Sequence, residues 1–340
     1  MAPQDPAAVA APEAGDAAAA PRAASTSAAD PSVRTFRIAT FAMVAALAVA
    51  PWVGLYPVFL MKALCFALFA CAFNLLIGYA GLLSFGHAMF FGTAGYVSAH
   101  AAKVWGLPPE VAILIGALAS TALGVVTGAL AIRRQGIYFA MITLAMAQML
   151  FFFYLQAPFT GGEDGIQSVP RGRMFGVLDL TQVMTMYYVV LAIFVAGFLV
   201  VRRVIHSPFG QVLKAIRENE PRAISLGYDA DRYKLIAFVL SAALSGVAGA
   251  TKAIVFQLAS LTDVQWQMSG EVVLMTLLGG MGTLFGPVVG AFTIISLEHF
   301  LADRGQWVTV TTGAIFVVCV LAFRRGIVGE LSAWWARRRG

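Results

Sequence analysis

The chain has 340 residues, 60% of them in the apolar set AVILMFWYC and only 12% of them charged. Soluble domains are about 45–50% apolar on a comparable set and about 25% charged. Because most residues of a soluble protein of this size stay partly exposed, the composition excludes a soluble enzyme, a nucleic-acid-binding module and a disulfide-stapled secreted domain. The mean hydropathy of +0.81 agrees. Lipid is therefore the expected solvent, and the net charge of +6 is typical of basic loops in a membrane protein.

Residues 1–33 are rich in Ala and Pro and contain no apolar stretch able to pack, which predicts a disordered tail. The tail does not resemble a secretory signal, because the basic pair Arg34 and Arg37 follows it and the next apolar run lacks a small-residue cleavage site. We expect a transmembrane domain over residues 34–326 and a basic tail over residues 327–340.

Apolar runs close to the length that crosses about 30 Å of hydrocarbon predict an all-α integral membrane protein with about ten transmembrane helices. The second, third and eighth runs are interrupted by Gly or short. The ten predicted spans are residues 38–56, 58–79, 87–103, 110–132, 136–157, 184–203, 233–258, 268–281, 284–302 and 306–324.

The basic residues predict the orientation of these spans. With ten spans and an inside N-terminus, 16 of the 23 Lys and Arg residues fall on the cytoplasmic side, among them the pairs Arg133–Arg134 and Arg202–Arg203. Such an excess is what the positive-inside rule requires of short loops. We therefore expect a multi-pass membrane protein with both termini in the cytoplasm.

Residues 207–234 form a segment between the sixth and seventh spans that is much longer than a turn, which indicates structure or function. Ser207 before Pro208 predicts one helix start, Asn219 predicts a second, and Gly227 predicts the end of the second helix. One interpretation is a helical docking element with Lys214, Arg217, Glu218 and Arg222 for polar contacts. The alternative is an amphipathic helix pair lying on anionic lipid.

Two Gly-rich stretches interrupt apolar runs in the two halves of the chain, GYAGLLSFGHAMFFGTAGY over residues 78–96 and GGMGTLFGPVVGA over residues 279–291. Gly weakens a helix by about 1 kcal/mol relative to Ala. Broken segments at membrane depth are tolerated inside protein or beside a cavity, and at matching places in two halves they indicate a transport path. Close packing of helices through small residues is the alternative.

Polar residues within or beside apolar runs are candidates for lining such a path. Each could instead make an ordinary bond between helices, and Glu271 could be a first-turn carboxylate stabilised by the helix dipole. The candidate pathway residues are Asn74, Ser84, His87, Gln148 and Glu271, with Thr143 as a further hydrogen-bonding side chain.

No catalytic constellation or metal site is predicted. Cys65, Cys71 and Cys319 lie in apolar runs, and the four His residues lack partners at metal-ligand spacing. The sequence also contains no GxxxxGK[ST] phosphate-binding loop, so it has no motor of its own. We expect no enzyme and no bound cofactor.

Five stretches of the sequence form one further pattern. They are residues 78–96, GIYFAMITLAMAQM over 136–149, TGGEDGI from Thr160, KAIRENEPRAISLGYDADRYKLIAFVLSAALSGVAG over 214–249 and VVLMTLLGGMGTLFGPVVGA over 272–291. Together they resemble the LivM-type permease subunits of branched-chain amino-acid ABC importers. The resemblance covers about residues 38–326 in order and leaves out the tail.

The resemblance implies a ten-helix permease of the type II importer kind in the bacterial cytoplasmic (inner) membrane. Its implied partners are a LivH-like second permease, two ABC ATPase subunits that use ATP, an extracytoplasmic solute-binding protein and membrane lipid, with no nucleic acid. Residues 207–228 would contain the helix that couples to the ATPase. Pro221 and Arg222 stand where the family motif has alanines. The residues implied in ATPase coupling are Lys214, Arg217, Glu218, Glu220, Ala223 and Gly227.

Other functions remain open at this point. Glu271 and His87 could serve an ion-coupled secondary transporter or channel. A membrane enzyme acting on lipid would need clustered acids, bases or metal ligands, and none is visible in the sequence. Within the importer interpretation, related permeases carry urea, short amides or other amino acids, so the sequence does not fix the solute.

Overall fold

A computed structural model describes residues 31–301, 310, 313–314, 317 and 326–330, with side chains from residue 38 onward. The chain divides into two compact units, Met1–Ala45 and Ala46–Gly340. In the first unit the described residues form the first part of helix α1 (Pro31–Val49). The helix starts inside the predicted tail, because Pro is favoured in the first turn of a helix. Residues 1–30 and most of the predicted span 306–324 lie outside the described residues.

The described chain is mostly helical, and nine of its helices overlap the first nine predicted spans. Among the described residues, five helices are long and apolar enough to cross a membrane: α2 with η2, α4, α5, α6 and α9. The bounds are α1 Pro31–Val49, η1 Ala50–Val53, α2 Pro57–Asn74, η2 Leu75–Ala80, α3 His87–Lys103, α4 Pro109–Ala131, α5 Ile137–Gln156, η3 Pro158–Thr160, η4 Gly162–Asp164, α6 Val183–Ile205, α7 Pro208–Glu218, α8 Glu220–Ser225, α9 Ala230–Phe256, η5 Leu261–Asp263, α10 Trp266–Gly279 and α11 Gly286–Leu301.

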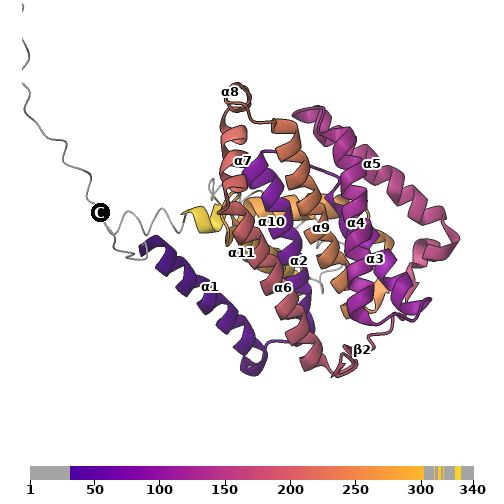
Figure 1. Ribbon diagram of the computed structural model, residues 1–340. Helices are drawn as coiled ribbons and strands as arrows, with labels where there is room; N and C mark the ends of the chain where they lie inside the picture. The colour runs from indigo at the N-terminus through magenta and orange to yellow at the C-terminus, as the bar shows by residue number, and fades with distance from the viewer. Residues whose placement is uncertain (1–30, 302–309, 311–312, 315–316, 318–325, 331–340) are drawn as a thin grey trace, which may run out of the picture. The chain divides into compact units, whose positions relative to one another are not determined.

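The centre of the second unit is built from helices α2, α3 and α9 (Figure 1). Helix α3 packs against α4 and α9, while α2 packs against α6, α9 and α11. Small residues allow the closest of these contacts: a Cβ on Gly249 of α9 would lie 1.9 Å from the Phe91 carbonyl oxygen of α3. Backbones this close exclude any side chain, so a glycine is required there.

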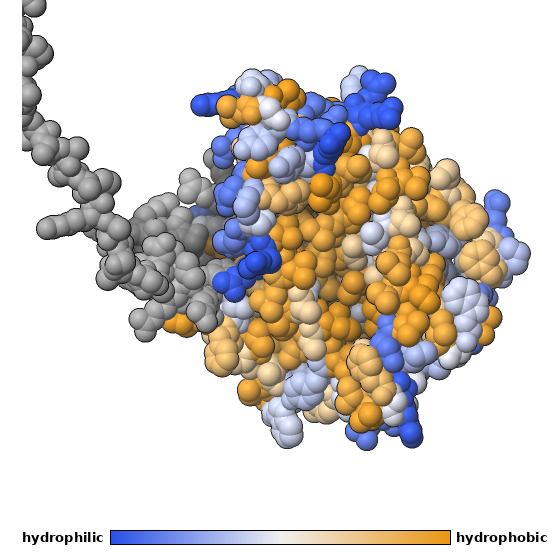
Figure 2. Space-filling model, viewed as in Figure 1, coloured by the Kyte–Doolittle hydropathy of each residue, from blue (hydrophilic) through white to orange (hydrophobic). Residues whose placement is uncertain are grey.

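Helices α4, α5 and α6 form the periphery of this unit. In their most apolar windows 39%, 28% and 39% of the residues are buried, against 89% for α2 with η2. Their exposed faces carry Leu, Val, Met and Phe side chains, and Figure 2 shows apolar residues over much of the middle of the visible face. An exposed surface of this composition is suited to lipid.

Four two-residue strands, which were not predicted, accompany the helices. Strand β1 (Ile166–Gln167) pairs antiparallel with β4 (Leu258–Ala259), and β2 (Arg173–Met174) pairs antiparallel with β3 (Leu178–Asp179). Strands this short carry no readable alternation of apolar and polar residues, so the sequence pattern could not reveal them. The β1–β4 pair ties the loop after α5 to the end of α9.

Candidate functional site: a helical knob joined to two broken helices

Residues 207–228 fold into two short helices, α7 and α8, which we call the knob. The predicted starts are confirmed: the Ser207 hydroxyl accepts a hydrogen bond from the Gly210 amide at 3.4 Å, and the Asn219 side chain accepts one from the Arg222 amide at 3.0 Å. Gly227 follows α8 with φ +90°, the left-handed conformation that ends many helices. The sequence therefore encodes the knob locally through its caps.

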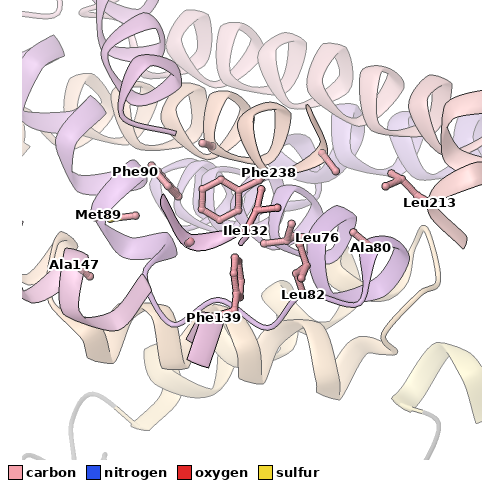
Figure 3. Close-up of a cluster of buried hydrophobic side chains, with 13 residues drawn as sticks. Leu76, Ala80, Leu82, Met89, Phe90, Ile132, Phe139, Ala147, Leu213 and Phe238 are labelled. Carbon is pink, nitrogen blue, oxygen red and sulfur yellow. The ribbon is translucent and has the colours of Figure 1, made fainter. Parts of the chain in front are cut away.

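The inner face of the knob is apolar. Leu213 of α7 is fully buried in a cluster with Leu76, Ala80 and Phe238 (Figure 3). A second cluster joins Ile216 and Ala223 to Ala230 of α9. Ala223, predicted to couple to a partner, is 2% exposed, so it holds α7, α8 and α9 together from within.

The outer end of the knob exposes apolar side chains. Ile224, Leu226 and Tyr228 are 54%, 71% and 40% exposed. The sequence showed that Ile224 and Leu226 are apolar but not that they point outward. In the structure Ala223 is the buried residue of α8, and Ile224 and Leu226 are left exposed. Exposed apolar side chains that form a contiguous patch commonly mark a site of interaction with a protein or a membrane. Gly227, between them, has open space around its Cα.

Charged residues anchor the knob to the bundle. Glu220 Oε1 lies 2.6 Å from the ammonium of Lys234, and the Lys234 side chain is almost fully buried. The same oxygen of Glu220 accepts a hydrogen bond from Gln135 at 3.0 Å. The Lys214 ammonium lies 5.6 Å from the centre of the Tyr79 ring. Of the predicted coupling residues, Glu218 is exposed, whereas Glu220 and Lys214 contact their own chain.

Two helices are broken next to the knob. Helix α2 continues as the π-helix η2 and stops at Gly81, whose φ is +74°. Helix α10 ends at Gly279, and α11 starts at Gly286 after a tight turn. A Cβ on Gly279 would lie 1.8 Å from the Gly286 carbonyl oxygen, so the turn requires glycine. These two breaks fall within the two Gly-rich stretches of the sequence.

Asn74 joins the two breaks. Its side-chain amide donates to the Thr283 carbonyl at 2.8 Å, and its Oδ1 accepts from the Gly282 amide at 2.9 Å. Asn74 is 1% exposed, so both bonds are shielded from water. The predicted pathway residue Asn74 therefore clamps the turn between α10 and α11 onto the end of α2.

Arg217 joins the knob to the same region. Its guanidinium donates a hydrogen bond to the Gly78 carbonyl of η2, and its aliphatic stem packs 3.0 Å from where a Cβ on Gly81 would lie. The contacts run without a gap from α7 through η2 and Asn74 to the α10–α11 turn. Neither long-range bond was predicted, since the partners are 139 and 209 residues apart in sequence.

Ser84, His87 and Thr143 lie around the gap between η2 and α3. Ser84 Oγ accepts from the Gly86 amide at 3.3 Å, and Thr143 donates to the Ala140 carbonyl at 2.9 Å. His87 is fully buried, with Nε2 2.8 Å from Ser241 Oγ and rings of Phe73, Phe90 and Phe238 around it. Because Ser241 donates its proton to the Ala72 carbonyl, His87 Nε2 carries the hydrogen of this bond.

Gln148 and Glu271 lie elsewhere in the bundle. Gln148 lines a hollow of about 140 Å³ with Phe151, Trp266 and Gln267. Glu271 is partly buried on α10. The structure thus separates the predicted pathway residues: Asn74, Ser84 and His87 lie by the first break, and the other two lie apart from it. Within the described residues, no three His, Cys, Asp or Glu side chains gather as metal ligands would.

Long apolar helices with a lipid-suited periphery and a helical knob define a polytopic helical membrane protein. The family described as branched-chain amino acid transport system / permease component matches residues 56–323. The chain belongs to this family.

Curated relatives carry names of the same kind. The high-affinity branched-chain amino acid transport system permease protein LivM of Salmonella typhimurium and that of Escherichia coli are each 26% identical over 279 residues, covering 75% of this chain and 65% of the relative. The probable branched-chain amino acid transport permease protein LivM of Methanocaldococcus jannaschii is 25% identical over 291 residues, 74% of this chain and 79% of its own. No solved structure matches this chain.

Proposed function

We propose that the chain is a permease subunit of an ATP-driven importer and that its solute is a branched-chain amino acid. The family and the names of the relatives support both parts of this proposal. The alternative solutes are urea, short amides or other amino acids, because a separate binding protein selects the solute in such systems. No chemistry on the solute is part of this function.

The proposed topology has ten spans, with the knob and both termini on the cytoplasmic side of the inner membrane. Helices α2, α4, α5, α6 and α9 are five of these spans. The remaining spans include α3, α10 and α11, which have 17, 14 and 16 residues. The basic residues of the knob and of Arg202–Arg203 support this orientation.

The observation that carries the proposal is the knob. It combines an apolar outer end with a continuous chain of contacts to both broken helices. Movement of the knob by an ATPase would therefore act directly on η2 and on the α10–α11 turn. Packed helices switch between a few discrete arrangements instead of deforming continuously. A displacement of the knob would therefore switch the helices between an arrangement with an open path and one with a closed path.

The partners in this proposal are a second permease of the LivH kind, two ABC ATPase subunits and an extracytoplasmic solute-binding protein. The exposed Ile224, Leu226 and Tyr228 would seat in an apolar groove of one ATPase. Glu218 and Arg222 flank this end and would make polar contacts there. Interfaces of this type have an apolar centre and a polar rim.

Leu226→Asp tests the docking. A carboxylate in an apolar groove loses its hydration without a partner, so we expect about a tenfold or greater loss of leucine uptake by the assembled importer in proteoliposomes. Co-purification of the ATPase subunits with the chain should fall as well. Folding should be preserved, because Leu226 is exposed.

Val177→Asp is the matched control for this experiment. Val177 is 83% exposed in the turn between β2 and β3, away from the knob, so uptake and ATPase retention should stay at the wild-type level. Wild-type uptake by Leu226→Asp would show that the outer end of the knob is not the docking surface.

A further inference from the structure

An apolar pocket of about 480 Å³ lies where α5 begins, next to the loop between η2 and α3. The first two turns of α5, residues 137–144, form one wall and extend about 12 Å along the helix axis. Residues 81–85 of the loop form the other wall. Every described wall residue is Gly, Ala, Leu, Ile, Met or Phe, so the pocket suits an apolar ligand of ordinary pocket size.

The pocket opens on the outside of the bundle. Its wall residues Leu83, Ile137 and Met141 are 37%, 77% and 60% exposed. Helix α5 is long and apolar enough to cross a membrane, and the pocket lies along its first turns. The opening therefore lies at the depth of one leaflet, where acyl chains are the surrounding solvent.

The floor of the pocket belongs to the core under the knob. Leu82 and Phe139 line the pocket and are 6% and 0% exposed. Both lie in the buried cluster that also contains Leu213 of α7 (Figure 3). An apolar ligand in the pocket would therefore pack against the cluster that holds α7 in place.

Two arginines precede the pocket at the turn between α4 and α5. Arg133 and Arg134 are exposed, and Arg134 stands two residues before the wall residue Gly136. In the part of the chain that the structure describes, neither guanidinium has an ion-pair partner. The Glu220 carboxylate, which reaches this turn through Gln135, is already paired with a lysine. Two adjacent cations without a carboxylate attract an anion, and the arginine fork matches a phosphate.

We propose that this pocket binds an acyl chain of an anionic phospholipid whose phosphate is held by Arg133 and Arg134. The chain of the lipid packs between Met141 and Leu83 and covers Leu82 and Phe139 at the floor. Basic pockets between membrane helices bind anionic headgroups in this way. The exposed Tyr138 ring lies at the same level, where aromatic rings favour the headgroup region. The site goes beyond the proposed function and does not depend on which solute crosses the membrane.

Other roles of these residues explain less of the structure. A topological signal alone accounts for the two arginines, but it requires no pocket beside them. The pair Arg202–Arg203 is such a signal at the end of α6, and α6 supplies no residue to the pocket. A transported amino acid would bury its charged groups against a wall without polar side chains, which is costly. Charge and apolar surface together therefore favour a phospholipid.

Replacing both Arg133 and Arg134 with Gln tests the headgroup contact. The full-length chain in neutral detergent is titrated with phosphatidylglycerol or phosphatidylcholine, and the bound lipid is measured by native mass spectrometry. The wild type should prefer phosphatidylglycerol, because its headgroup is anionic whereas that of phosphatidylcholine has no net charge. Each arginine near an anionic headgroup adds about a fivefold attraction, so the double variant should bind phosphatidylglycerol at least about tenfold more weakly.

Replacing both Arg202 and Arg203 with Gln is the matched control, since it removes the same charge from the end of α6 and should leave phosphatidylglycerol binding unchanged. Equal phosphatidylglycerol affinities of the wild type and the Arg133 and Arg134 variant would overturn the site. Equal losses in the two double variants would also overturn it, because the attraction would then come from net charge alone.

Ala140→Phe tests the acyl-chain contact independently. Ala140 lines the pocket, so the added ring takes the space of the acyl chain, and binding of phosphatidylglycerol should fall about tenfold while the melting temperature stays unchanged. Unchanged phosphatidylglycerol binding by Ala140→Phe would overturn the pocket as the lipid site. If this variant also failed to retain the second permease, the pocket would belong to an interface between subunits. None of these measurements requires transport, so their failure would leave the proposed function standing.

Discussion

At the scale of single residues, Arg217 and Asn74 determine how the knob is tied to the bundle. Arg217 donates from α7 to the Gly78 carbonyl, in a place where η2 has left the regular α-helical pattern. Asn74 uses both ends of its amide to hold the α10–α11 turn. Hydrogen bonds depend on distance and angle, whereas apolar contacts do not depend on direction. These two residues therefore fix the relative positions of distant segments more tightly than apolar contacts would.

Arg217→Met should uncouple the motor from the path. The side chain keeps much of its apolar stem, so α7 stays packed through Leu213, while the bond to Gly78 is lost. Loss of one charge-assisted bond corresponds to about a tenfold change in a coupled equilibrium, so leucine uptake per ATP hydrolysed should fall about tenfold. The measurement is parallel uptake and ATPase assay in proteoliposomes.

Arg232→Met provides the comparison for Arg217, because Arg232 is exposed on α9 and pairs with Asp229. Its uptake per ATP should equal that of the wild type. If Arg217→Met and the wild type took up the same amount of leucine per ATP hydrolysed, the bond between Arg217 and Gly78 would not take part in the coupling.

At the scale of elements, glycines set how closely the helices approach. The α3–α9 contact brings the Phe91 carbonyl over Gly249, where no side chain fits. Gly249→Ala would force the two helices apart along their whole contact. Overpacking typically lowers the free energy of unfolding by about 1–3 kcal/mol. Because the Phe91 carbonyl oxygen is part of the rigid backbone, we expect Gly249→Ala to lower it by about 3 kcal/mol.

Gly270→Ala is the same chemical change as Gly249→Ala, but we expect the opposite effect on stability. Gly270 lies in α10 with nothing within 4 Å of a Cβ, so the alanine should raise stability by up to about 1 kcal/mol through its helix propensity. Thermal unfolding of both variants in detergent checks the pair. Equal melting temperatures for Gly249→Ala and wild type would refute the close contact.

Elements that depend on local signals could be predicted from the sequence. The apolar runs indicated nine of the described helices, and Ser207, Asn219 and Gly227 marked the ends of the knob helices. The two-residue strands have no periodic pattern and were missed.

Features that depend on distant partners could not be predicted. Asn74 was recognised as a polar residue at depth, but its contact with a turn 209 residues away is not encoded locally. For the same reason nothing in the sequence showed that Lys62 and Glu298, 236 residues apart, form an ion pair. The outward direction of Ile224 and Leu226 depends on α9, against which Ala223 packs.

At the scale of the whole molecule, contacts run from the knob to η2 and to the turn between α10 and α11. In the proposed function, the work on the solute comes from a separate ATPase subunit. The knob contacts η2 and the start of α9, and the Lys62–Glu298 and Lys252–Asp263 ion pairs lie toward the other ends of α2 and α9. The central claim is therefore that this chain is a permease driven through its knob by ATP hydrolysis elsewhere.

The most direct test is uptake of labelled L-leucine into proteoliposomes containing this chain alone or with the second permease, both ATPase subunits and the binding protein. The account predicts uptake only in the complete assembly, only with ATP, and without dependence on an imposed ion gradient. Concentrative uptake by the chain alone under a proton or sodium gradient would contradict it and identify an ion-coupled transporter.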